Sequence, residues 1–130
     1  MKKPKIKMTV VKEDTGYSAY TKVADDFIGT QGDNFDGLKT MILDAVNLSF
    51  EDRDFVYSID EIEFQYDLAS FFDFYKVINA KALSERIGMN QSLLAQYIKG
   101  NKKPSVSQTK RILQGVQQIG RELSEVRFLL

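Results

Sequence analysis

Apolar residues alternate in a strand-like way through most of the first half of this chain, and from about residue 68 they recur at helical spacing. In residues 5–12, Ile6, Met8 and Val10 fall on one side and polar residues on the other, as in a half-buried strand. The same reasoning predicts strands at 17–20, 27–31 and 61–67. We therefore predict an α+β chain: a small antiparallel β-β-β-α-β domain at 1–67, then an all-α domain at 68–130.

The helix of the first domain is predicted at residues 34–49, where Phe35, Leu38, Ile42 and Ala45 recur at spacings of three and four. Asp33 is the expected N-cap, and a carboxylate at Asp36 suits the positive end of the helix dipole. A short linker is expected near residues 67–70, because no Gly- or Ser-rich stretch separates the two halves.

The zero net charge of the chain conceals opposite charges on its halves. Residues 1–67 hold 8 Lys/Arg and 14 Asp/Glu (net −6), and residues 68–130 hold 10 and 4 (net +6). A basic module of this kind suits a polyanion, although the two halves could simply attract each other.

The 130 residues include no cysteine and no histidine. This inventory excludes thiolate zinc sites, cysteine catalysis and a Ser-His-Asp triad. No apolar run approaches the ~20 residues that cross a bilayer. We expect a cytoplasmic protein that binds no cofactor and no metal.

The basic half contains the most informative stretch, residues 80–100. Leu83 and Ile87 lie four apart and predict one face of a short helix. Gly88 follows where a sharp turn needs a positive φ. Asn90 or Ser92 can then cap a second helix, which buries Leu94 and either Tyr97 or Ile98. Two short helices joined by a tight glycine turn form a helix-turn-helix.

The second of these helices carries the candidate DNA-reading residues. Gln91, Ser92 and Gln96 are predicted to face outward and contact base edges, because short polar side chains there can read the major groove. The expected contacts to the DNA backbone are Asn90, Lys99, Asn101, Lys102 and Lys103. The turn after Lys99 is expected to offer free backbone N–H groups as well as lysines to phosphates.

A third helix is predicted from Ser105, which forms an S-x-x-Q capping box with Gln108. Its apolar stripe consists of Ile112, Val116, Ile119, Leu123 and Val126. This stripe could complete the core or face a second copy of the chain. A homodimer or higher oligomer is expected, since one such motif reads only half a palindromic operator.

Two segments carry a family likeness. Ile-Gly-Met-Asn-Gln-Ser (87–92) and Lys-Gly-Asn-Lys-Lys-Pro (99–104) resemble the Xre class of lambda-type phage repressors. This resemblance implies base contacts at Gln91, Ser92 and Gln96. One departure is Ser84, where that class usually has alanine for close helix packing.

The first half resembles the HicB antitoxin domain in Gly-Tyr-Ser-Ala-Tyr (16–20) and Thr-Gln-Gly-Asp-Asn (30–34). The resemblance implies a partial ribonuclease-H-like fold without nuclease activity. It also implies a type II antitoxin that masks a basic, RNA-cleaving HicA-type toxin and represses its own operon. One departure is that members of this family usually have a segment resembling Pro-Gly-Cys between the second and third strands. In this chain residues 23–29 stand there, and only the glycine is kept.

Other functions remain open on the residues alone. An active ribonuclease-H-type enzyme would need carboxylates converging on two Mg²⁺ ions, with candidates at Asp25, Asp26, Asp33, Asp36 and Asp44. Helix capping and a solvated turn explain these residues better, so we expect no enzyme. The main alternative to an antitoxin is a free-standing transcriptional regulator, whose first domain dimerises or senses a ligand. A further alternative is an interaction module whose basic half binds acidic protein.

The aromatic run at residues 71–75 also has two interpretations. Phe71, Phe74 and Tyr75 could stack on the bases of a single strand. We favour the alternative that they form a core joining the two modules.

Overall fold

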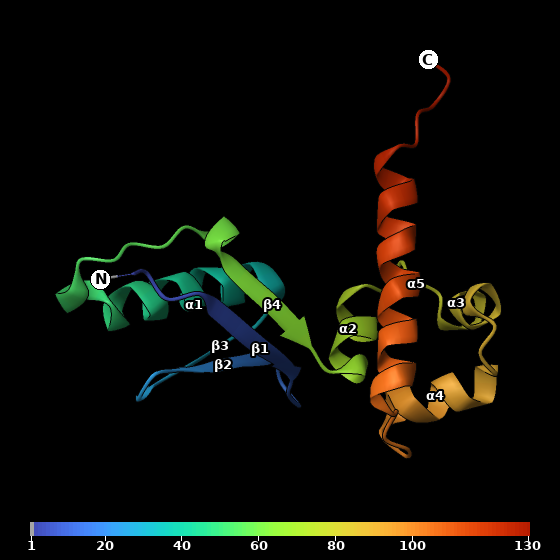
Figure 1. Cartoon of the computed structure of the whole chain (residues 1–130), viewed down its shortest axis with the longest axis horizontal. Coiled ribbons are helices and arrows are strands. Elements are labelled where there is room, and N and C mark those ends of the chain that lie inside the picture. The colour runs from blue at the N-terminus through green and yellow to red at the C-terminus, as the bar shows by residue number, and fades with distance from the viewer. Residues whose placement is uncertain (1) are drawn as a thin grey trace. The chain divides into compact units, whose positions relative to one another are not determined.

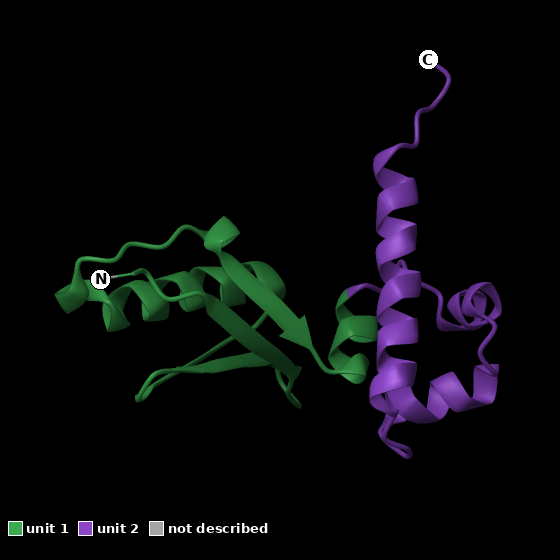
Figure 2. Ribbon diagram, viewed as in Figure 1, with its two compact units in different colours: residues 1–74 green, residues 75–130 purple. Residues whose placement is uncertain are grey.

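The computed structural model describes residues 2–130 and divides the chain into two compact units, Met1–Phe74 and Tyr75–Leu130, hereafter unit 1 and unit 2 (Figure 2). The predicted α+β class is confirmed. The division after Phe74 lies one short helix beyond the predicted boundary at residue 67, because that helix packs into unit 1. Within the described residues, no helix is long and apolar enough to span a membrane.

Unit 1 contains a four-stranded sheet with the strand order β3-β2-β1-β4 (Figure 1). Its strands are β1 (Ile6–Lys12), β2 (Tyr17–Val23), β3 (Asp26–Gly32) and β4 (Ile62–Tyr66). The first three strands form antiparallel hairpins. β4 pairs with β1 in parallel, with Ile6 opposite Ile62. The predicted all-antiparallel sheet is therefore wrong, and the sheet is mixed.

The parallel pairing of β4 follows from the helix that precedes it in the chain. Helix α1 (Phe35–Ser49) leaves β3 and crosses one face of the sheet, and the chain then returns as β4 beside β1. A crossover of this length joins parallel strands, whereas a tight hairpin joins antiparallel ones. The alternation of Ile62, Phe64 and Tyr66 shows only that one face of β4 is buried, not its direction.

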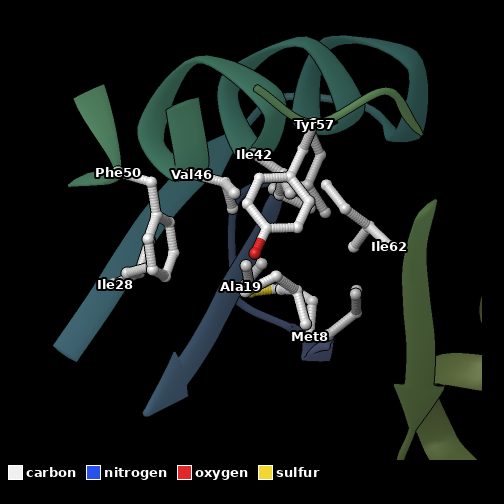
Figure 3. Close-up of a cluster of buried hydrophobic side chains, with 11 residues drawn as sticks. Met8, Ala19, Ile28, Ile42, Val46, Phe50, Tyr57 and Ile62 are labelled. Carbon is white, nitrogen blue, oxygen red and sulfur yellow. The ribbon is translucent and has the colours of Figure 1, made fainter. Parts of the chain in front are cut away.

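The core of unit 1 lies between α1 and the covered face of the sheet (Figure 3). Buried strand residues meet Leu38, Ile42 and Val46 of α1. The loop between α1 and β4 contributes Phe50 and Tyr57, and it includes two 3₁₀ turns, Glu51–Arg53 and Ile59–Glu61. Asn47 holds this loop on α1, since its side chain exchanges hydrogen bonds of 2.7 and 3.1 Å with the backbone of Tyr57.

The start of α1 differs by one residue from the prediction. Asn34, not Asp33, is the N-cap, and its Oδ1 accepts a 2.7 Å hydrogen bond from the Gly37 N–H. Asp36 does lie in the first turn. Asp and Asn cap helices about equally well, so two adjacent candidates cannot be separated by residue type.

Helix α2 (Leu68–Phe74) belongs to unit 1 through specific contacts. The Ser70 Oγ accepts a 2.7 Å hydrogen bond from the Lys12 N–H. Asp73 accepts hydrogen bonds from the Tyr17 hydroxyl at 2.6 Å and the Lys12 ammonium at 2.8 Å. Phe74 stacks on Tyr17, with ring centroids 4.2 Å apart. Phe74 is thus part of the aromatic core of unit 1.

Unit 2 consists of α3 (Ala80–Ile87), α4 (Gln91–Lys99) and α5 (Val106–Ser124). Helix α3 contacts both of the others. The apolar side chains buried in this unit are Leu83, Met89, Leu94 and Ile112. This core of four apolar side chains is small for three helices.

Candidate nucleic-acid interface

Helices α3 and α4 are joined by a turn of three residues whose geometry is fixed at both ends. Gly88 ends α3 with φ +69°, the left-handed conformation expected from the sequence. The Met89 N–H then donates a 2.8 Å hydrogen bond to the Ser84 carbonyl, and the Met89 side chain is buried. The turn is therefore anchored by both backbone and core.

Of the two predicted candidates, Asn90 and Ser92, Asn90 is the N-cap of α4. Its Oδ1 accepts hydrogen bonds from the N–H groups of Ser92 at 2.8 Å and Leu93 at 3.2 Å. Two of the four unpaired N–H groups at this helix start are thereby satisfied. Because the Asn90 oxygen is engaged in this way, only its amide nitrogen remains to donate to a phosphate.

The outward face of α4 includes two of the three predicted base-reading residues. Gln91 and Ser92 are exposed at the N-terminal end of the helix. Ala95 and Lys99 lie three and seven residues after Ser92, on the same helical face. Ala95 is half-buried and was not among the predicted contacts, although its spacing from Ser92 points to it.

Gln96 is placed differently from the prediction. Its side chain is half-buried, and its Oε1 is screened from solvent with no hydrogen-bond partner among the described residues. Gln96 lies one turn after Leu93, which is itself half-buried, so this side of α4 is not fully open to solvent. A bidentate contact from Gln96 to adenine would require this oxygen to turn outward.

The first residues of the turn after α4 use their backbone N–H groups internally, which corrects the expectation that these groups are free. Gly100 ends α4 with φ +82°. The N–H groups of Asn101 and Lys102 both donate to the Gln96 carbonyl, at 2.9 and 3.3 Å. At these two residues, phosphate contacts must therefore come from side chains.

The lysine side chains of this region are available for such contacts. Lys99, Lys102 and Lys103 are exposed, and none of them forms an ion pair within residues 2–130. Asn101 is exposed beside them. The segment therefore presents three uncompensated positive charges at the C-terminal end of α4.

Two arginines of unit 2 have structural contacts instead. The Arg111 guanidinium donates to the carbonyls of Ile87 and Gly88, each at 2.8 Å from Nη2, and so satisfies the C-terminal end of α3. Arg86 forms a two-pronged ion pair with Glu122 of α5, with N–O distances of 2.7 and 3.0 Å. Hydrogen bonds from Arg86 and then Gln118 hold the pKa of Glu122 below its ordinary value.

Helix α5 packs closely on α3. A Cβ added at Gly115 would lie 2.4 Å from Cγ2 of Ile87, so the helices approach where no side chain intervenes. Ser84 of α3 is buried, and its hydroxyl donates a 2.6 Å hydrogen bond to the Lys81 carbonyl. Serine is thus accommodated at the position where the resemblance leads one to expect alanine.

The beginning of α5 satisfies half of the predicted capping box. The Ser105 Oγ accepts a 3.1 Å hydrogen bond from the Gln108 N–H. In its apolar stripe Ile112 is buried, Val116 and Ile119 are half-buried, and Leu123 is exposed. Val126 lies beyond the end of the helix.

The candidate carboxylates of unit 1 do not gather into a metal site. Within residues 2–130, no three acidic side chains come close enough to hold a metal ion. Asp26 instead forms an ion pair with Arg53. The segment at residues 23–29 forms the tight β2–β3 hairpin, in which Ala24 has a positive φ of 55°.

Comparisons with protein-family models, curated proteins and solved structures give no match to this chain. The function of the chain is therefore inferred from the geometry of its two units.

Proposed function

We propose that unit 2 binds duplex DNA as a helix-turn-helix and that unit 1 neutralises a basic, RNA-cleaving toxin of the HicA type, so that the chain acts as an antitoxin repressing its own operon. The observation that carries the proposal is the exposed polar start of α4, followed at its other end by three unpaired lysines.

In the proposed complex α4 enters the major groove with its N-terminal residues against the base edges. A helix of this kind fits the B-DNA major groove, which is about 12 Å wide. The Gln91 amide can donate and accept at adenine, and the Ser92 hydroxyl can do either at several bases. The Ala95 methyl group, on the same face, suits the methyl group of thymine.

Lys99, Lys102 and Lys103 would contact phosphates on the flank of the groove. Their charges are uncompensated within the described residues, and their flexible stems tolerate some variation in backbone position. Such contacts hold the register of the protein on DNA but read no sequence.

A second copy of the chain would supply the other half-site. On α5, Val106 and Leu113 are 73% and 51% exposed and lie seven residues apart, on one side of the helix. Leu123, which is 61% exposed, continues the line of the buried residue Ile112 toward the end of the helix. These three exposed side chains form the apolar strip of α5. Pairing of this strip across a two-fold axis would bury it and present two α4 helices to a palindrome.

Unit 1 has the charge expected of a protein that binds a basic partner. Residues 1–74 hold 8 Lys/Arg and 15 Asp/Glu (net −7), whereas residues 75–130 hold 10 and 3 (net +7). An open groove of about 490 Å³ lies at the C-terminal end of α1, with the exposed side chains of Leu48 and Val56 in its wall. Asp44, Glu51 and Asp54 also line it. This acidic groove with apolar walls suits a basic toxin surface.

The experiment that tests both parts uses the full-length chain. DNase I footprinting on a 200-base-pair fragment from upstream of its own gene should show paired protections about one helical turn apart. The tagged chain should also co-purify with the small basic product of the neighbouring gene. Protection without a captured partner would support the free-standing regulator, and the absence of protection at low salt would contradict the DNA-binding proposal.

A matched pair of variants locates the partner surface. Val56→Arg places a positive charge in the acidic groove and should abolish co-purification. Met41→Arg adds the same charge at another exposed apolar position, on α1 but outside this groove, and should retain the partner. Equal retention by both variants would show that the groove is not the docking surface.

A further inference from the structure

The sheet of unit 1 has a second face, opposite α1, that its described elements leave open. Alternate residues of the strands point to this face, and they are exposed or half-buried, whereas their neighbours on the α1 side are buried or half-buried. The open face shares no residue with the acidic groove at the C-terminal end of α1 or with the proposed DNA-binding helix α4.

The strand register places the side chains of the open face in rows. Thr9 of β1 lies between Gln65 of β4 and Tyr20 of β2, and Tyr20 lies opposite Gly29 of β3. The Gln65 amide donates a 2.8 Å hydrogen bond to the Thr9 hydroxyl. Tyr20 therefore occupies the middle of the sheet, with polar side chains on one side and a glycine on the other.

Phe27 completes an aromatic platform beside Tyr20. Their ring planes are inclined by only 16°, with centroids 6.3 Å apart. A Cβ added to Gly29 would lie 2.9 Å from a ring carbon of Phe27, so the phenyl ring lies over the glycine. The rings are 45% and 71% exposed, and a hollow of about 380 Å³ extends from them to Gln31.

Lysines flank this platform although unit 1 is acidic overall. Lys22 of β2 lies directly opposite Phe27 of β3. Thr9 of β1 lies opposite Tyr20 of β2, and the same register continued by two residues brings Lys7 opposite Lys22. Glu63 is the β4 neighbour of Lys7. Both lysines are exposed and form no ion pair within the described residues. The open strand face thus carries more positive than negative charge.

We propose that this open face binds single-stranded RNA, with bases stacked on Tyr20 and Phe27 and phosphates held by Lys7 and Lys22. Four-stranded sheets with exposed aromatics bind single strands in this way, because every base has a π-face and splayed bases can stack on the rings. Gln31, at the end of the hollow, can hydrogen-bond a base edge. The inference is independent of the proposed DNA-binding function, since it uses no residue of unit 2.

The two proposed nucleic-acid sites should differ in their dependence on salt. For single strands the slope of log affinity against log salt is roughly −0.7 per phosphate contacted, so two lysines give about −1.4. A duplex site with six phosphate contacts gives about −5. A given rise in salt should therefore weaken RNA binding to the sheet far less than duplex binding.

The test is fluorescence anisotropy with the full-length chain and a labelled, mixed-sequence 12-nucleotide RNA, with a DNA duplex as second probe. Phe27→Ala and Tyr20→Ala should each raise the Kd for RNA at least about fivefold, the lower end of measured stacking losses, and leave the Kd for duplex unchanged. Lys102→Ala should show the reverse pattern. Met41→Ala, which removes an exposed apolar side chain of α1 outside both the acidic groove and the aromatic hollow, should change neither.

Phe27→Leu separates stacking from folding, because leucine still covers Gly29 but offers no π-face. We expect it to keep the thermal melting curve of the wild type and to lose RNA affinity. Three results would overturn the proposal: wild-type RNA affinity in Phe27→Leu, RNA binding that depends on Lys102 alone, or no binding of the 12-nucleotide RNA at 50 mM salt. A change in molecular mass on Tyr20→Ala would instead assign the face to a second copy of the chain.

Discussion

Gln91 and Lys102 illustrate two kinds of side chain at the proposed DNA interface. Gln91 is exposed at the start of α4, where a base edge would lie, and Lys102 is exposed in the turn that follows the helix. Gln91→Ala should weaken operator binding by about 1–3 kcal/mol and leave binding to unrelated duplex nearly intact. Anisotropy titrations with both duplexes measure this difference.

Lys102→Ala serves as the counterpart, because a phosphate contact carries no sequence information. It should weaken operator and unrelated duplex alike and flatten the salt slope by about one unit. The same effect from both substitutions on both duplexes would mean that the roles assigned to Gln91 and Lys102 are wrong.

The Arg86–Glu122 ion pair predicts a pH-dependent contribution to the stability of unit 2. Arg86 keeps the pKa of Glu122 below its ordinary value in the folded state. The resulting stabilisation is complete above the unfolded-state pKa of about 4.3 and is lost as the pH falls through the lower, folded value. Acid should therefore weaken the contact between α3 and α5.

Glu122→Gln removes this contribution, so the urea midpoint of the variant should depend less on pH between 7 and 3 than that of the wild type. The midpoint is best followed through NMR signals of α3 amides, which report on unit 2. Glu125→Gln is the matched control, since Glu125 forms no ion pair within residues 2–130. Identical pH profiles for Glu122→Gln and the wild type would contradict the prediction.

Two glycines of α5 make a matched pair. A Cβ at Gly115 would collide with Ile87 of α3, whereas one at Gly120 meets no atom within 4 Å. Gly115→Ala should destabilise unit 2, since overpacking typically costs about 1–3 kcal/mol, more than the helix propensity gained. Gly120→Ala should stabilise it by about 0.5–1 kcal/mol. Denaturant midpoints of α3 and α5 amides test this, and equal effects would contradict the packing described.

The sequence allowed the helix ends of unit 2 to be predicted, because caps are local. The Asn90 side-chain oxygen caps α4, and Gly88 ends α3 in the left-handed conformation, as the sequence indicated for each position. The direction of β4, the inward turn of the Gln96 oxygen and the capping of α3 by Arg111 were not predicted. The direction of β4 and the Arg111 contact depend on residues distant in the sequence, which neither spacing nor residue type reveals.

The exposed apolar strip on α5 predicts that two copies of the chain associate. Leu113→Glu combined with Leu123→Glu places charges on this strip, so like charges would face each other across the two-fold axis. We expect a monomer by light scattering and a loss of paired protections on the operator fragment. Val77→Glu, at another exposed apolar position of unit 2, should leave the mass unchanged. A double variant with the wild-type mass would show that another surface joins the copies.

The opposite charges and the change in apolar spacing were enough to predict that the chain has two units, but not at which residue the boundary between them lies. Helix α2 has the helical spacing of the second half, yet Ser70, Asp73 and Phe74 attach it to β1 and β2. Moving the boundary to residue 74 increases the separation of charge from −6 and +6 to −7 and +7. The chain is therefore an acidic unit joined to a basic one, and the basic unit carries α4.

The salt dependence of binding to the upstream DNA fragment tests most directly whether this basic unit holds a duplex. Affinity of the full-length chain should be measured by anisotropy between 50 and 200 mM salt. Six phosphate contacts predict a log–log slope of roughly −5, and Lys99→Ala and Lys103→Ala should each flatten it by about one unit. Binding that ignores salt, or no binding at 50 mM, would contradict the account.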